Sequence, residues 1–308
     1  MDVYDRIHTR QPVRNVVQYV AENDILFDAD EFLQQLDIVL QRNKYYAKQL
    51  LKELIRYFEQ KGSDFAEVVY EPYIDLLPVG APGPQDSDVI QYRFGEYKVA
   101  IEETPSMICA QGTTGFRTWE AALFLCHYMT ENPGSFSCYN GAMLELGCGT
   151  GIISILYKMM KDCQPETKSE GIIVTDGDSN LLQQVSRNFR LNGLLPSGAD
   201  STVRLQRLRW NDDELHEDEK VDLVLAADVT YDTSVIPDLV ACLSQFKGSV
   251  GYVSCTERNL ATLDAFENEL EKKHLAFEIV SSISPTAFQH ISERNISTRI
   301  RIYKISIN

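Results

Sequence analysis

The stretch LELGCGTG, residues 144–151, decides the fold of this chain. Three glycines occupy alternate positions, Gly147, Gly149 and Gly151, directly after a short apolar run. Glycine has no Cβ, so a backbone that contains it can turn sharply and approach a ligand closely. An open α/β sheet binds nucleotide-like ligands at such a turn, outside the carboxyl ends of its strands. We therefore expect a ligand site here. The alternative is a glycine-rich turn that serves only tight packing.

The spacing of these glycines disfavours a dinucleotide. That fingerprint, G-x-G-x-x-G, needs a third glycine at position 152, where this chain has Ile152. Glu145 also adds negative charge where a pyrophosphate would lie. An NAD-dependent oxidoreductase is therefore the least favoured function. An acid at Glu145 suits a ligand with an ammonium or sulfonium centre, and it favours S-adenosylmethionine (SAM) as the bound cofactor.

Predicted strands and helices alternate around this turn. The strands are predicted at residues 142–146, 171–176, 202–208, 221–228, 249–256, 275–283 and 297–307. The helices are predicted at residues 118–128, 152–161, 180–191, 236–246 and 258–273. This alternation is typical of an α/β fold with a doubly wound, mostly parallel sheet. We count seven strands, of which the last two form an antiparallel hairpin.

The first quarter of the chain has a different sequence pattern. Residues 1 to about 75 look helical, most clearly residues 30–62, where apolar side chains recur at three- and four-residue intervals and Gly62 ends the helix. The Pro- and Gly-rich stretch LPVGAPGPQD, residues 77–86, reads as a connection. We therefore predict an N-terminal helical domain, residues 1–80, that could recognise a substrate.

A second domain is predicted over residues 90–308, and it contains the sheet. It opens with IQYRFGEYKVAIEE, in which apolar and polar residues alternate on both sides of Gly95. This pattern predicts a β-hairpin that leads into the sheet.

The net charge of the 308 residues is −16 and the pI is near 4.8. Nucleic-acid binders depend on clustered Lys and Arg, so we expect no nucleic-acid partner. Seven cysteines without CxxC pairs or histidines at zinc spacing indicate no disulfide framework and no metal site. No signal peptide and no long apolar run are found, so we expect a soluble cytoplasmic protein without a membrane partner.

Acidic residues also follow the second predicted strand, in VTDGDSN. Asp176 could accept both hydroxyls of a ribose, since one carboxylate can receive two O–H donors. Asp178 is the other candidate for the ribose, and it could instead cap the next helix, with Ser179 and Asn180 as rival caps. Trp210, in LRWND, could offer an aromatic face to adenine or be an ordinary, partly buried tryptophan.

The run VDLVLAADVTYD, residues 221–232, ends on polar side chains. Its apolar part suits a strand buried on both faces, and Asp228 closes it with Tyr231 three positions later. Strand four should lie beside strand one, so Asp228 should face the same cleft as the glycine loop. The alternatives are that Asp228 caps a helix or satisfies loop amides, and that Tyr231 only packs.

Taken in order, LELGCGTG, VTDGDSN, LRWND and AADVTY resemble the class I, seven-strand SAM-dependent methyltransferases. They look most like the lysine-methylating branch, which carries an acid-x-x-Tyr tetrad after strand four, here Asp228 to Tyr231. The segment GTTGFRTWEAALFL, residues 112–125, also resembles that branch. With YVSCTERN, residues 252–259, and the helical N-terminal extension, the chain resembles the elongation factor 2 lysine methyltransferase family.

The resemblance implies a cytoplasmic enzyme that methylates a lysine of translation elongation factor 2 with SAM. We also expect a monomer. It implies cofactor contacts at Trp119, Gly147, Cys148, Gly149, Asp176, Trp210 and Ala227. Asp228 would orient the lysine amine, and Tyr231 would be a second acceptor or an aromatic wall. Two alternatives remain open: a methyltransferase for another protein or a small molecule, and a SAM-fold binding or assembly module without catalysis.

Overall fold

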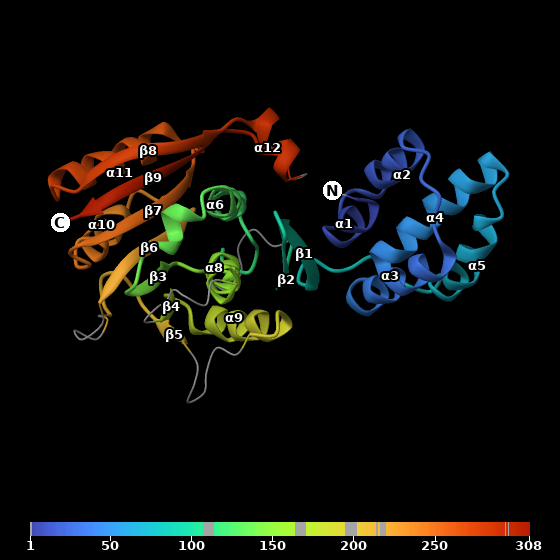
Figure 1. The fold of residues 1–308 in the computed structure, drawn as a ribbon, viewed down its shortest axis with the longest axis horizontal. Coiled ribbons are helices and arrows are strands. Elements are labelled where there is room, and N and C mark those ends of the chain that lie inside the picture. Colours follow the sequence, from blue (N-terminus) through green and yellow to red (C-terminus); the bar gives the residue numbers. More distant parts are fainter. Residues whose placement is uncertain are drawn as a thin grey trace. The chain divides into compact units, whose positions relative to one another are not determined.

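The computed structural model describes residues 2–106, 114–163, 171–194, 202–213, 215, 220–292, 294 and 296–308. The chain divides into two compact units, which Figure 1 draws as ribbons. The helical unit comprises Met1–Arg93 and Ala100–Met107. The sheet unit comprises Phe94–Val99 and Ile108–Asn308.

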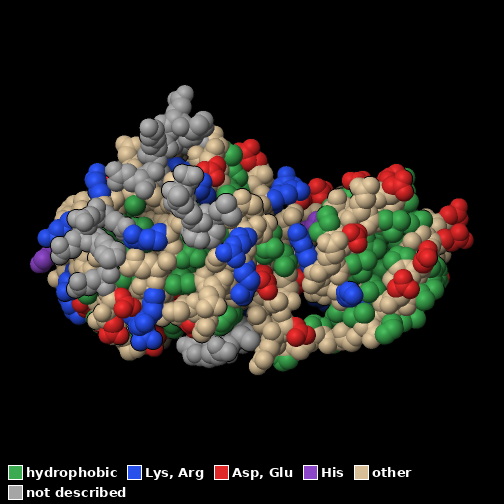
Figure 2. Space-filling view, turned by 90° about the horizontal axis from the view of Figure 1, so that it is seen from below, with side chains coloured by type: hydrophobic (Ala, Val, Ile, Leu, Met, Phe, Trp, Pro, Cys, Tyr) green, Lys and Arg blue, Asp and Glu red, His purple; other side chains and the backbone are tan. Residues whose placement is uncertain are grey.

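The helical unit contains α1 (Val3–His8), α2 (Val13–Glu22), α3 (Ala29–Arg42), α4 (Lys44–Lys61) and α5 (Phe65–Asp75). Buried apolar side chains from all five helices form one core. Other large apolar side chains stay exposed: Leu26, Leu33, Tyr70, Ile74 and Leu77. Apolar side chains with Asp and Glu among them cover the visible face of this unit, at the right of Figure 2.

The helix predicted over residues 30–62 is two helices, and the prediction of one helix was wrong. The chain leaves helical geometry at Asn43, whose Oδ1 accepts a hydrogen bond of 2.8 Å from the Tyr46 amide and caps α4. Both helices bury the same kind of apolar stripe, so periodicity alone does not reveal the break. Gly62 has φ +65° and ends α4, as predicted.

The predicted hairpin is present. It consists of β1 (Asp88–Phe94) and β2 (Tyr97–Glu103), which pair in a two-stranded sheet and turn at Gly95, where φ is +59°.

The sheet unit contains β3 (Ala142–Leu146), β4 (Ile172–Asp176), β5 (Val203–Arg207), β6 (Val221–Ala227), β7 (Ser249–Thr256), β8 (Ala276–Ile283) and β9 (Ile300–Ile307). Their order in the sheet is β5-β4-β3-β6-β7-β9-β8. Strands β3 to β7 are parallel, and β9 runs antiparallel to both of its neighbours. The predicted fold class, with seven strands and an antiparallel last pair, is confirmed. The last pair is not a tight hairpin, because α12 (Pro285–Ile291) lies between its strands.

Helices cover both faces of this sheet. They are α6 (Glu120–Glu131), α7 (Gly134–Ser137), α8 (Ile152–Asp162), α9 (Ser179–Leu191), α10 (Ile236–Leu243), α11 (Leu260–Lys272) and α12. In Figure 1, α6, α8 and α9 lie on one face and α10 and α11 on the other. Every predicted helix of this unit is present with shifted ends, whereas the short α7 and α12 were not predicted. Among the described residues, no helix is both long and apolar enough to cross a membrane.

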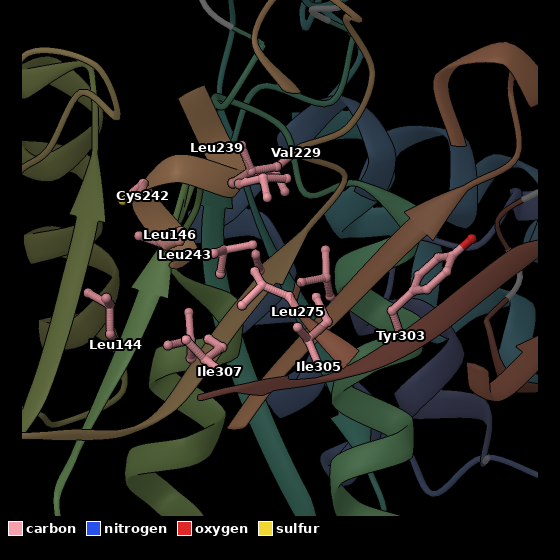
Figure 3. Packing of buried hydrophobic residues seen from close by; sticks show 14 of the residues in the cluster. Leu144, Leu146, Val229, Leu239, Cys242, Leu243, Leu275, Tyr303, Ile305 and Ile307 are labelled. Carbon is pink, nitrogen blue, oxygen red and sulfur yellow. The ribbon is translucent and has the colours of Figure 1, made fainter. Parts of the chain in front are cut away.

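The core beneath α10 and α11 holds the strands in place. Leu144 and Leu146 of β3 are fully buried, as expected for a parallel strand covered on both faces. Figure 3 shows side chains of α10 and β9 in the same cluster, among them Leu239, Leu243 and Ile305. The carboxyl ends of β3 and β6 are therefore fixed at one edge of a rigid layer.

The six cysteines in the described part of the chain are free, and Cys109 lies outside it.

Candidate functional site

A cavity of about 670 Å³ lies at the carboxyl ends of the central strands. The chain leaves β3 toward β4 and β5 on one side of the sheet, while β6 and β7 lie on the other, so the connections diverge here. The volume is in the usual range for small-molecule sites, about 300–1,000 Å³. The predicted site residues all line it: Trp119, Glu145, Gly147, Cys148, Gly149, Asp176, Trp210, Ala227, Asp228 and Tyr231. Their binding roles stay predictions.

The glycine loop follows β3 and lines the cavity. Gly147 has φ +63°, and a Cβ there would lie 2.9 Å from Cγ1 of Val229. Gly149 has φ +51°, and a Cβ there would lie 3.3 Å from the carbonyl oxygen of Gly115. Tight packing thus accounts for these glycines, and ligand binding would be a further use of the same backbone.

The segment before α6 lies against this loop. Thr118 and Thr150 share a hydrogen bond of 2.9 Å between their hydroxyls. The Trp119 indole donates to the carbonyl of Thr114 at 2.9 Å, and its half-buried ring lines the cavity. The first two residues of GTTGFRTWEAALFL lie outside the described residues.

Glu145 is 1% exposed and is directed at α8. The backbone amide of Ser154 donates to its Oε2 at 3.1 Å, and the Ser154 hydroxyl donates to the same oxygen. Burial raises the pKa of Glu145 to about 8, so its neutral form predominates at pH 7. The negative charge expected of Glu145 is therefore reduced in the folded chain, and its hydrogen bonds tie β3 to α8.

The two acids at the carboxyl end of β4 have different partners. Asp178 caps α9, because its Oδ1 accepts from the Asn180 amide at 2.8 Å, and its interpretation as a cap is confirmed. Asp176 accepts from the Gly149 amide at 3.1 Å and from the Asp178 amide at 3.0 Å. Burial raises the pKa of Asp176 above its ordinary value. A carboxylate has about four acceptor positions, so Asp176 keeps capacity for hydroxyl donors.

Two residues that were predicted to contact the cofactor, Trp210 and Cys148, are partly or fully buried. Trp210 is half-buried, lines the cavity and packs against the core of the sheet, so both interpretations of it agree with its position. Cys148 is buried, and burial raises the pKa of its thiol. A thiol that stays protonated is a poor nucleophile, which agrees with a role for Cys148 as a small residue in the loop.

Asp228 is the first residue after β6 and has φ +54°, which is uncommon for a residue other than glycine. Its side chain is 6% exposed. Its Oδ1 accepts from the Thr256 amide at 3.2 Å, and its Oδ2 accepts from the Arg258 guanidinium at 2.8 Å. Burial raises the pKa of Asp228, and Arg258 acts in the opposite direction. The carboxylate thus satisfies a loop amide and also borders the cavity.

Ala227 and Tyr231 flank this acid. Ala227 ends β6, and Tyr231 lines the cavity from its rim with 58% of its surface exposed. Solvent therefore reaches the Tyr231 side chain at the edge of the cavity.

Two arginines at Trp119 were not predicted. The Cζ atoms of Arg258 and Arg117 lie 4.7 Å and 4.8 Å from the centre of the Trp119 ring, within reach of a cation–π interaction. Arg117 also pairs with Glu120 at 2.5 Å. Both arginines lie inside motifs quoted above, GTTGFRTWEAALFL and YVSCTERN, and no spacing rule marks them.

A sequence profile described as lysine methyltransferase matches residues 105–273, and these include every residue that lines the cavity. The chain belongs to the lysine methyltransferase family. Protein-lysine N-methyltransferase EFM3 of Saccharomyces cerevisiae is 36% identical over 98% of both chains. Protein-lysine N-methyltransferase EEF2KMT of Homo sapiens is 31% identical over 76% of this chain and 72% of its own.

Among solved structures, an S-adenosylmethionine-dependent methyltransferase from Clostridium acetobutylicum superposes with a TM-score of 0.40 at 14% identity. It covers 61% of this chain, and 92% of that chain is matched.

Membership of the lysine methyltransferase family confirms the predicted enzyme class, a protein-lysine N-methyltransferase. It also agrees with the sheet, whose cavity lies at the point where the strand order reverses.

Proposed function

We propose that this lysine methyltransferase transfers methyl groups from SAM to a lysine of translation elongation factor 2. The observation that carries the proposal is the position of Asp228, a buried acid at the mouth of a cavity that begins at the glycine loop. The substrate follows the name of the human relative, EEF2KMT, and the resemblance of the motifs to that family.

The residues of the cavity fit SAM. Asp176 would accept the ribose hydroxyls, and Trp119 and Trp210 would offer aromatic faces. Gly147, Cys148 and Gly149 would allow close approach of the ligand, with Ala227 beside them at the end of the neighbouring strand β6. When bound, SAM supplies a methyl group whose C–S bond breaks, with its electron pair going to sulfur, as the lone pair of a neutral lysine amine forms the N–C bond.

The task of the protein is to deliver that amine neutral and aligned. Free lysine has a pKa of about 10.4 and is mostly protonated at pH 7. Asp228 would accept a hydrogen bond from the incoming ammonium and orient it, and the proton would leave to water before attack. Tyr231, exposed at the rim, would form a second acceptor or an aromatic wall for the methylated cation.

We further propose that the enzyme works in the cytoplasm as a monomer. The described residues of one copy line the cavity on their own, which supports a complete site in a single chain. Size-exclusion chromatography with light scattering tests the oligomeric state, and a mass of twice 35.0 kDa would contradict the monomer.

The proposal is tested by incubation of a cell lysate with the purified chain and radiolabelled SAM. We expect one labelled band at the mass of elongation factor 2, and mass spectrometry of that band should find methyllysine. Label only in low-mass products would favour a small-molecule methyltransferase. Calorimetry with SAM separates a non-catalytic module, since absence of binding would reject an enzyme that uses this cofactor.

A further inference from the structure

Arg258 is the cation that faces the buried acid of the proposed lysine site. It follows β7, and its guanidinium donates to Oδ2 of Asp228 at 2.8 Å. The Arg258 side chain is 41% exposed, whereas that of Asp228 is 6% exposed. The second carboxylate oxygen of Asp228 accepts from the Thr256 amide. The two carboxylate oxygens of Asp228 thus have different donors, a backbone amide and the guanidinium of a partly exposed side chain.

This arrangement has two electrostatic consequences. A buried carboxylate without a partner would take up a proton, and a nearby cation keeps it ionised. A lysine ammonium that approaches the same carboxylate is repelled by the positive charge of Arg258. This repulsion lowers the pKa of the ammonium and favours its neutral amine form, since like charges disfavour the charged form. Arg258 therefore acts on both groups that the proposed reaction needs.

We propose that Arg258 is a positioning residue of the lysine site, which fixes Asp228 as an ionised acceptor and favours entry of the target amine in its neutral form. This inference rests on the proposed function. Arg258 also lies over the ring of Trp119, with 4.7 Å from Cζ to the ring centre, so its guanidinium contacts two residues that line the cavity, Trp119 and Asp228.

The other charged and titratable groups around this pair come from every neighbouring element. Cys255 of β7 stays a neutral thiol, because burial raises its pKa to about 12. Among the described residues the others include Arg117 and Arg294, which both pair with Glu120 of α6, Glu257 with its partner Arg301 of β9, Tyr231 and Asp232 after β6, Asp238 of α10, and Asp176 at the end of β4. Within the described residues, Arg258 is the cation paired with Asp228 itself.

Loss of the Arg258 charge should move the pH dependence in one direction. Without it the pKa of Asp228 rises further, and the pKa of the bound lysine also rises. Both changes mean that a higher pH is needed to have Asp228 ionised and the lysine amine neutral. In Arg258→Gln we expect the rising limb of kcat/KM against pH to move up by about one pH unit, and activity at pH 7 to fall about tenfold but recover at high pH.

Conservative and matched variants separate this effect from damage to the fold. Arg258→Lys keeps the charge and should keep the midpoint near that of the wild type. Arg117→Gln removes the other cation beside Trp119, which is paired with Glu120 and not with Asp228, and should leave the midpoint unshifted whatever its rate. A lower rate of Arg258→Gln with an unshifted midpoint, or an equal shift in Arg117→Gln, would overturn the proposal.

A second readout needs no substrate and stays informative if elongation factor 2 proves not to be methylated. The chain has two tryptophans, so Trp210→Phe leaves Trp119 as the sole tryptophan fluorophore. Acid titration of the purified Trp210→Phe protein should change Trp119 emission as Asp228 becomes protonated and releases Arg258. Arg258→Gln or Asp228→Asn in that background should abolish the transition. No transition in Trp210→Phe, or the same transition in all three proteins, would overturn the inference, whereas failure of methylation alone would reject only the proposed function.

Discussion

Glu145 joins β3 to α8 through a carboxyl that the fold keeps away from water. Its ordinary pKa of 4.5 rises to about 8, mainly through burial, although the two hydrogen bonds from Ser154 act in the opposite direction. The folded chain therefore binds a proton at Glu145 that the unfolded chain releases near pH 4.5. The stability that this proton contributes is complete below pH 4.5 and is lost as the pH rises to about 8.

Glu145→Gln should remove this dependence on pH. The amide oxygen of glutamine can still accept from Ser154, and it does not ionise. We expect the free energy of unfolding of the wild type to fall relative to the variant between pH 4.5 and pH 8, by on the order of a few kcal/mol. Urea unfolding at several pH values measures this. A difference in unfolding free energy between the wild type and Glu145→Gln that stays constant with pH would contradict this expectation. Glu53→Gln is the control, because Glu53 forms an exposed ion pair within a helix.

At this scale the sequence predicts residues whose role follows from their place on a strand. Asp228 was predicted to face the cleft because an acid ends a buried strand there, and Tyr231 because it completes the acid-x-x-Tyr motif; both line the cavity, and their roles stay predictions. Asp178 was predicted as a cap because a carboxyl before a helix can accept from its first amides. Arg258 was not found, because it lies 30 positions from Asp228 and only the parallel pairing of β6 with β7 brings them together. The raised pKa of Glu145 depends on α8 covering it, which a local pattern does not show.

The glycine loop is the element on which the account depends most. Strands of a parallel sheet are nearly continuous apolar runs, so β3, β6 and β7 were predicted closely. Helix ends were less well predicted, and the break at Asn43 was missed because the apolar period continues through it. The loop itself was predicted from glycine spacing, but its contacts with Val229 and Gly115 come from segments far along the chain.

Gly147→Ala tests the loop as an element. The substitution places a Cβ 2.9 Å from Val229 at φ +63°, so it should strain both the loop and the turn after β6. We expect a loss of about 1–3 kcal/mol in unfolding free energy and at least tenfold weaker SAM binding by calorimetry.

Gly193→Ala is the matched control, since its φ is +71° and no atom of the described residues lies within 4 Å of the Cβ that alanine would add. It should cost about 1–2 kcal/mol and leave SAM affinity unchanged. Equal SAM affinity in the wild type and Gly147→Ala would show that the loop does not contact the cofactor.

At the scale of the whole molecule, two compact units divide the work that we propose. The sheet unit carries the cavity, and the helical unit exposes apolar side chains that a helical core does not need. The domain boundary was predicted at the Pro- and Gly-rich connection because helical periodicity stops before it. The structure places most of the hairpin with the helical unit, whereas the domain prediction began the sheet domain at residue 90.

Exposed apolar residues of the helical unit should serve recognition of the protein substrate. We expect the triple variant Leu26→Ser, Ile74→Ser and Leu77→Ser to raise KM for elongation factor 2 at least threefold, with kcat and SAM affinity unchanged, because contact area is lost away from the cavity. Steady-state kinetics with the protein substrate measures this. Ile279→Ser, on the exposed edge strand β8, is the control, and an unchanged KM in the triple variant would reject the role.

The most direct test of the central claim compares the wild type with Asp228→Asn. Purified elongation factor 2 and radiolabelled SAM are the substrates, and calorimetry measures SAM affinity of both proteins. Asparagine keeps the shape of the side chain but carries no charge to orient an ammonium. The account predicts that Asp228→Asn loses methyl transfer to elongation factor 2 by at least a hundredfold while SAM affinity changes only a few-fold. Full activity of Asp228→Asn would contradict it.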